Sequence, residues 1–143
     1  MVTLQPVITP ADLVEGRAGQ PLLAPIPAGW PSPAENYVED SLDLHRLVVR
    51  NPPATFFLRV VGHSMVGAGI HNGDLLVVDR SITPISGKVV VAKVDGELTV
   101  KRLLKRQGKM VLCPENPDFK EIDLDASEET YIWGVVTHAL HQL

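Results

Sequence analysis

The sequence predicts a mainly β protein in which short strands follow a proline-rich N-terminal arm and one short helix. Three observations predict this fold class. Short runs rich in Val, Ile, Leu and aromatic residues recur after residue 54. Gly, Asn, Asp and Pro separate these runs at turn positions. Six of the 12 prolines fall within residues 1–31, where they remove backbone donors and favour extended conformations.

Residues 1–31 have the composition of an extended arm without a core of its own. We therefore predict two parts: a flexible arm over residues 1–31 and a β-domain over residues 32–143.

A short helix is predicted to begin at Ser32. Ser32 can cap the helix, Pro33 suits its first position, and Glu35 completes a capping box. Apolar residues then recur at helical spacing as far as Leu42. Residues 44–49 either extend this helix or form a separate turn.

The rest of the chain reads as strands joined by turns. The predicted strands are Thr55–Val61, Asp74–Asp79, Lys88–Val94, Glu97–Leu104, Lys109–Cys113 and Tyr131–Thr137. The pair Asp95-Gly96 between two of these runs is a strong signal for a two-residue hairpin loop. Frequent short strands without intervening helices predict an all-β core, antiparallel or mixed.

Composition narrows the classes of function. A net charge of −4 and a pI of about 5.7 argue against sequence-specific DNA binding through a broad basic face. Cys113 is the only cysteine, so no internal disulfide can form, and its apolar neighbours predict a buried thiol. No apolar run reaches the length of a membrane span and no secretory signal is present, so we expect a cytoplasmic protein. No histidine–carboxylate spacing predicts a metal site, and no cofactor is expected.

Four segments carry candidate chemistry: Gly62–Met65, Gly69–Asp79, Gly87–Ala92 and Asp95–Leu103. Each alone is a weak signal, because a Ser after Gly is usually a turn residue and a Lys in a strand usually faces solvent. Together, in this order, they resemble the catalytic core of the UmuD and LexA family of self-cleaving proteins. That family shows G-x-S-M, G-I-x-x-G-D, G-D-I-V-x-A and D-G-E-x-T-V-K. Lys88 departs from the pattern, at a position that is not catalytic in the family.

The resemblance implies that Ser64 is a nucleophile and Lys101 its general base. A serine hydroxyl needs a base, and a lysine can be that base only when its amine is neutral. Burial supplies this, because desolvation penalises the charged form. Lys101 shares a strand face with Thr99 and Leu103, and the other face is also apolar, which predicts a buried strand.

Other candidate bases fit less well. His63 is adjacent to Ser64 in sequence, but neighbouring residues of an extended segment point apart. The remaining lysines of the strand region lie beside turns or polar neighbours: Lys88, Lys93, Lys105 and Lys109. The backbone N–H of Ser64 is a reasonable oxyanion donor.

The resemblance also implies that the arm contains the bond that is cut, which in this family is Ala-Gly or Cys-Gly. Ala28-Gly29 is the better candidate, because residues 30–37 resemble the UmuD sequence after its cut. Ala18-Gly19 lacks this downstream match. Cutting after Ala28 leaves residues 29–143, which is 115 residues.

Residues 1–28 are too short and too proline-rich for a helix-turn-helix domain. The chain therefore resembles the UmuD branch, which implies further partners. These are a RecA filament on single-stranded DNA that stimulates cleavage, a second copy of the chain in a homodimer, and a UmuC-type polymerase subunit in error-prone translesion synthesis (SOS mutagenesis).

Three alternatives remain open at this point. The chain could be a signal-peptidase-like Ser–Lys enzyme that acts on other proteins. It could be a non-catalytic β-module that regulates a polymerase or repressor partner by docking. It could also be a phage or plasmid repressor fragment without its DNA-binding domain.

Overall fold

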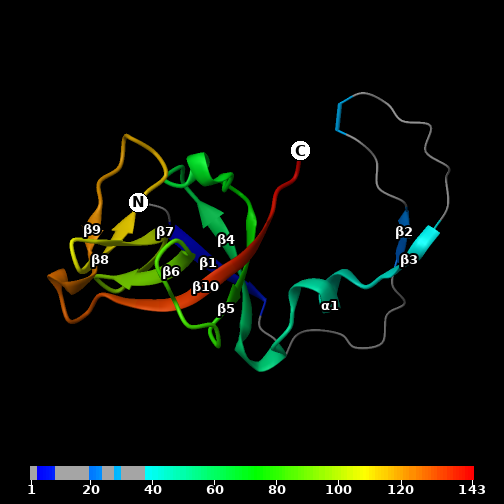
Figure 1. The fold of residues 1–143 in the computed structure, drawn as a ribbon, viewed down its shortest axis with the longest axis horizontal. Coiled ribbons are helices and arrows are strands. Elements are labelled where there is room, and N and C mark those ends of the chain that lie inside the picture. Colours follow the sequence, from blue (N-terminus) through cyan, green and yellow to red (C-terminus); the bar gives the residue numbers. More distant parts are fainter. Residues whose placement is uncertain (1–2, 9–19, 24–27, 30–37) are drawn as a thin grey trace. The chain divides into compact units, whose positions relative to one another are not determined.

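The computed structural model describes residues 3–8, 20–23, 28–29 and 38–143, and it is mainly β (Figure 1). The chain divides into two compact units. Val14–Arg50 forms the smaller one, and Met1–Leu13 together with Asn51–Leu143 forms the larger one. Within the described ranges, no helix is both long and apolar enough to cross a membrane.

The larger unit holds an eight-stranded antiparallel sheet in the order β1-β4-β5-β10-β6-β7-β8-β9. Its strands are β1 (Thr3–Ile8), β4 (Thr55–Val61), β5 (Leu75–Asp79), β6 (Val89–Val94), β7 (Glu97–Arg106), β8 (Lys109–Cys113), β9 (Ile122–Asp123) and β10 (Tyr131–Leu140). In Figure 1, β10 runs in orange and red across the middle of the sheet and pairs with both β5 and β6. Short 3-10 helices η2, η3 and η4 lie in the connections, at Pro52–Ala54, Val66–Ala68 and Leu124–Ala126.

The predicted strands are confirmed. β4 and β8 have the predicted bounds, and the other four differ from the prediction at one end. The predicted hairpin at Asp95-Gly96 joins β6 to β7, with Val94 paired to Glu97. Asp95 and Gly96 have φ of 49° and 83°, and positive φ at both central residues is the requirement of a type I′ turn.

The predicted helix is wrong where it can be compared. Residues 32–37, with the expected capping box, lie outside the described residues. Val38–Leu42 is not helical but forms strand β3, which pairs with β2 (Gln20–Leu23) in the smaller unit. The described helix is α1 (Leu44–Val48), and its N-cap is Asp43, whose side chain accepts a hydrogen bond from the Arg46 N–H. Pairing with β2 therefore prevails over local helical spacing.

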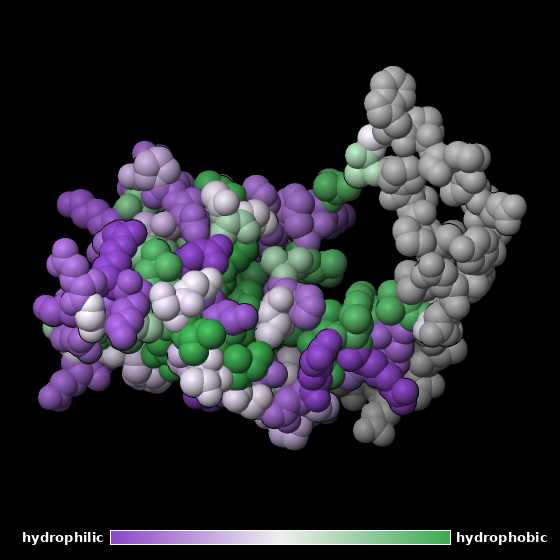
Figure 2. Space-filling view, viewed as in Figure 1, coloured by the Kyte–Doolittle hydropathy of each residue, from purple (hydrophilic) through white to green (hydrophobic). Residues whose placement is uncertain are grey.

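The core of the larger unit forms two apolar clusters. One comprises Leu58, Val60, Met65, Ile70, Leu76, Val78, Val91 and Val100. The other comprises Val90, Ala92, Val94, Leu103, Leu112 and Val135. Consecutive residues of β6 alternate between the clusters because successive side chains of a strand face opposite sides. In Figure 2, hydrophilic side chains gather at the end of the sheet that carries β8 and β9.

Candidate active site

Ser64 lies in the turn that follows β4, just before η3. Its side chain is fully buried, at 0% exposure. The Ser64 carbonyl accepts a hydrogen bond of 2.8 Å from the Glu115 N–H, and the Gly67 N–H donates one of 2.8 Å to the Glu115 carbonyl. The segment after β8 therefore holds the turn that carries the hydroxyl.

Lys101 lies in the middle of β7 and is 2% exposed. It pairs with Val90 on β6, whereas β8 pairs with β7 only from Arg102, opposite Cys113, to the hairpin end. Because β8 ends there, the chain leaves the sheet beside Lys101 as the segment that carries Glu115.

The Ser64 hydroxyl and the Lys101 amine meet in this buried place. Lys101 Nζ lies 3.0 Å from Ser64 Oγ, 2.9 Å from Thr99 Oγ1 and 3.1 Å from the Val100 carbonyl oxygen. Burial lowers the pKa of Lys101 from 10.5 to about 8, because the ammonium loses hydration. The structure thus brings together the two residues that the sequence singled out. Because β5, β10 and β6 separate β4 from β7 in the sheet, this contact requires a strongly curved sheet.

Arg102, Glu115 and Asn116 brace the Ser64 turn from outside. Arg102 Nε lies 2.5 Å from Glu115 Oε1. Arg102 Nη1 donates a hydrogen bond of 2.7 Å to the Gly87 carbonyl oxygen. Asn116 Nδ2 donates a hydrogen bond of 2.8 Å to the His63 carbonyl oxygen. No local sequence pattern predicts these contacts, because Glu115 and Asn116 meet residues that lie some 50 positions earlier in the chain.

Gly67 is required at the centre of this brace. A Cβ at this position would lie 2.6 Å from the Glu115 carbonyl oxygen. That contact is too short for any side chain, so the close approach of η3 to the segment after β8 needs a glycine.

The alternative bases are not placed for the role. His63 is exposed, and in the described part of the chain no hydrogen bond joins its ring to Ser64. Lys88, Lys105 and Lys109 are exposed, and Lys93 is half-buried. Burial also raises the pKa of the Cys113 thiol, with the Glu121 carboxylate adding to the effect, so this cysteine stays protonated.

The Ala28–Gly29 bond lies in the connection between β2 and β3. Both residues are exposed, and Gly29 has φ of 153°, a conformation that favours glycine. The predicted scissile bond is thus exposed, in the connection between two paired strands of the smaller unit.

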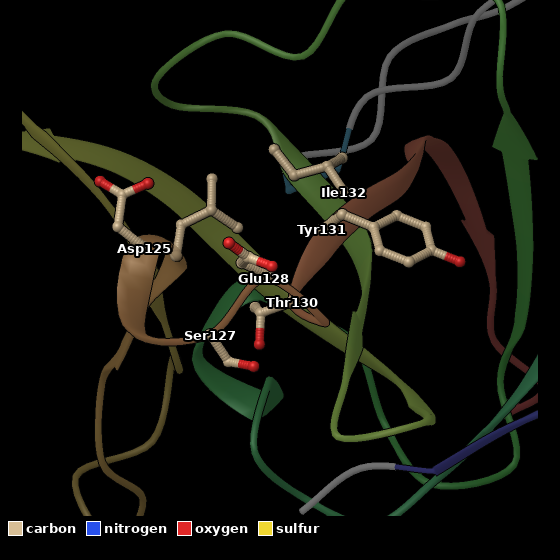
Figure 3. Close-up of a pocket in the computed structure, with 7 residues that line it drawn as sticks. Asp125, Ser127, Glu128, Thr130, Tyr131 and Ile132 are labelled. Atoms are coloured by element: carbon tan, nitrogen blue, oxygen red, sulfur yellow. The ribbon is translucent and has the colours of Figure 1, made fainter.

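A shallow pocket lies where η4 leads into β10 (Figure 3). Asp125 and Glu128 bring carboxylates to it, whereas Tyr131 and Ile132 project from β10 in opposite directions. Neither Ser64 nor Lys101 lines this pocket.

Comparisons with known proteins agree with the residue patterns. A family model described as Peptidase S24-like matches residues 21–137. Protein MucA of Salmonella typhimurium is 53% identical over 116 residues, which are 80% of this chain and 79% of MucA. Protein SamA of Salmonella typhimurium (strain LT2) is 47% identical over 116 residues, 81% of this chain and 80% of SamA. Protein ImpA of Shigella flexneri is 50% identical over 117 residues, 80% of this chain and 78% of ImpA.

Proposed function

The chain belongs to the Peptidase S24-like family, a family of serine peptidases, as a member of the UmuD type. From this premise we propose that it is an endopeptidase that cuts its own chain between Ala28 and Gly29. Ser64 is the nucleophile and Lys101 the general base. One observation carries the proposal: Lys101 Nζ and Ser64 Oγ lie 3.0 Å apart, and both side chains are buried.

The three contacts of Lys101 suit a neutral amine. Such an amine has two N–H donors and one lone pair. The Val100 carbonyl can only accept, and the Thr99 hydroxyl oxygen can accept the second N–H. The lone pair is then left for the proton of the Ser64 hydroxyl. With a pKa of about 8, roughly one Lys101 in ten is neutral at pH 7.

The chemical steps follow from this proton. Ser64 Oγ attacks the Ala28 carbonyl carbon, and its proton moves to Lys101 Nζ. The Lys101 ammonium then protonates the leaving Gly29 nitrogen, the Ala28–Gly29 bond breaks, and Ala28 is left as an ester on Ser64. Water, deprotonated by the same amine, hydrolyses this ester and releases the Ala28 carboxylate. The tether between the bond and the site supplies a high effective concentration.

The Ser64 N–H is our proposed donor to the oxyanion of the tetrahedral intermediate. Among the described residues it has no backbone or side-chain acceptor. A backbone donor in a turn held at its carbonyl by Glu115 is fixed before the reaction begins.

For the biological role, we propose that the trimmed chain, residues 29–143, acts as a homodimer with a UmuC-type subunit in error-prone translesion synthesis. A RecA filament on single-stranded DNA stimulates the cut. The similarity to the UmuD type supports this role. A cytoplasmic location accompanies it as a prediction.

The test is the mass of the products after incubation at pH 7 and at pH 10. We expect a fragment that begins at Gly29, formed about tenfold faster at pH 10 because Lys101 is then neutral. Ser64→Ala and Lys101→Ala abolish it, whereas the control Lys88→Ala, at an exposed lysine, retains it. Folded protein that stays intact at both pH values would contradict the proposal and favour a non-catalytic docking module.

A further inference from the structure

Strand β1 lies upstream of the proposed cut, yet it forms an edge of the main sheet. β1 runs antiparallel to β4, with Thr3 opposite Val61 and Gln5 opposite Arg59. Residues 3–8 belong to the same compact unit as β4. The part of the chain that the cut separates therefore supplies a strand to the part that remains.

This pairing is imperfect. Pro6 lies opposite Leu58, and proline has no N–H to donate to the ladder. The register then shifts between Pro6 and Ile8, so that Val7 has no partner on β4. A proline and a bulge in a six-residue strand leave β1 with a weak hold on β4.

The cut at Ala28–Gly29 would change the thermodynamics of this pairing. In the intact chain β1 is tethered, so its effective concentration near β4 is of millimolar order. In the cut protein the fragment 1–28 is held by non-covalent contacts alone. Among the described residues these include the pairing of β1 with β4 and of β2 with β3, and the contact of β1 with β7. At micromolar protein, a short strand with a proline and a bulge dissociates.

Strand β4 keeps its contacts with β5 and with the apolar core when β1 dissociates. Its other edge pairs with β5 from Thr55, opposite Asp79, to Arg59, opposite Leu75. Leu58 and Val60 are buried in the apolar core. Loss of β1 therefore leaves an ordered strand with a free row of backbone N–H and C=O groups, which is a template for another strand.

We propose that the freed edge of β4 is a docking site for an extended segment of a partner protein, which adds to the sheet antiparallel to β4. This inference rests on the proposed cut. β1 itself indicates the chemistry of the occupant, because its sequence, Thr-Leu-Gln-Pro-Val-Ile, is uncharged and largely apolar. A partner segment of this kind without the proline and the bulge pairs more completely and binds more tightly.

The opposite edge of the sheet does not offer the same site. There the last strand is β9, which has two residues, Ile122 and Asp123. Such a short edge with a carboxylate is typical of edges protected against pairing.

The experiment measures peptide binding and amide hydrogen exchange on the full chain before and after its own alkaline cleavage. The probes are a fluorescent peptide of residues 1–10 and the same peptide with Pro6→Val. We expect the Pro6→Val peptide to bind the cleaved protein about tenfold more tightly than the unchanged peptide, which binds only above micromolar concentration. Neither peptide should bind intact Ser64→Ala. Amides of β4 should exchange about tenfold faster after cleavage, and slow again with peptide, while β6 and β7 stay protected.

A second arm tests the edge without cleavage. In the Ser64→Ala background, Leu4→Pro breaks β1 and should open the edge to the Pro6→Val peptide, whereas Ala11→Pro, outside β1, should not. Absence of a Gly29 fragment would count against the proposed function only, since this arm still tests the edge. Binding in neither arm would overturn the inference. If self-association alone slowed amide exchange in β4, the edge would belong to a second copy of the chain and the inference would be overturned. It would also be overturned if amide exchange became faster throughout β6 and β7 after cleavage, because β1 would then be needed for the stability of the whole sheet.

Discussion

At the scale of single residues, the buried amine of Lys101 suits catalysis and opposes stability. The folded protein holds a proton on Lys101 with a pKa of about 8, whereas the unfolded chain holds it with the ordinary value of 10.5. Between these values the unfolded state binds more protons than the folded state, so stability rises with pH across this window. Below pH 8 the fold carries the full cost of the buried amine.

Replacement of this amine should therefore stabilise the protein at neutral pH. We predict that Ser64→Ala/Lys101→Met is more stable than Ser64→Ala at pH 7, and that the difference shrinks by roughly 3 kcal/mol from pH 8 to pH 10.5. Denaturant unfolding of both variants across this range measures it. If the free energies of unfolding of the two variants changed with pH in parallel, the Lys101 amine would not be buried as described.

Thr99 tunes the same amine through its hydroxyl, 2.9 Å from Nζ. We predict that Thr99→Val shifts the midpoint of the pH–rate profile for cleavage down by about half a unit to one unit. The ammonium loses more than the neutral amine, because hydrogen bonds from charged donors are stronger. Thr99→Ser, which keeps the hydroxyl, is the control and should keep the midpoint. A midpoint that stays fixed or rises in Thr99→Val would contradict this role.

At the scale of elements, the site is a meeting of two strands that are distant in the sheet. Ser64 leaves the end of β4, Lys101 lies within β7, and the segment after β8 ties the Ser64 turn to β7 through Glu115 and Arg102. The position of the Ser64 hydroxyl therefore depends on the Arg102–Glu115 ion pair, which includes neither Ser64 nor Lys101.

Glu115→Gln should slow cleavage by about tenfold without moving its pH midpoint, because the change loosens the Ser64 turn but leaves Lys101 in its pocket. The matched control is Glu121→Gln, which removes the exposed ion pair with Arg106 elsewhere on β7. Cleavage rates and pH midpoints of both variants, measured over pH 6 to 10, separate an effect on the Ser64 turn from an effect on the Lys101 pKa. An equal effect of both substitutions, or a shifted midpoint in Glu115→Gln, would refute the positioning role.

Local patterns predicted the strands that are runs of apolar residues bounded by turn residues, including β10, whose partners β5 and β6 are distant in sequence. They failed in the proline-rich N-terminal part of the chain, where β2 pairs with β3. Runs rich in apolar residues and the Asp95-Gly96 turn were enough for β6 and β7. β1 and β2 were missed because Pro6 and Pro21 argue against strands, although edge strands tolerate proline. Motif order singled out Ser64 and Lys101, whereas the Glu115 brace is a product of tertiary folding alone.

At the scale of the whole molecule, the C-terminal residues contact the segment that carries Ser64. After β10, His141 Nδ1 lies 2.6 Å from Oδ1 of the buried Asp74, and the other oxygen of this carboxylate accepts from the His71 N–H. Asp74 ends the long connection between β4 and β5 that contains Ser64. The last residues of the chain thus anchor the base of the Ser64 connection.

Removal of this anchor should lower stability. We predict that His141→Ala in the Ser64→Ala background lowers the free energy of unfolding by about 1 kcal/mol, because the buried Asp74 carboxylate loses a hydrogen-bond partner. His138→Ala is the control, since His138 is exposed and its ring contacts only the neighbouring Thr137 in the hydrogen bonds of the described residues. Thermal unfolding compares them. If both variants unfold together with the parent, the C-terminal contact is not an anchor.

The proposed cleavage requires a neutral Lys101 amine that acts on Ser64, and one measurement tests this requirement directly. The Lys101 side chain is titrated by NMR in ¹³C-lysine-labelled Ser64→Ala protein, and its midpoint is compared with the midpoint of the cleavage rate of the unsubstituted chain. We predict that both midpoints lie near the Lys101 pKa of about 8. A Lys101 that titrates near its ordinary value of 10.5, or a cleavage rate that does not follow its titration, would contradict the account.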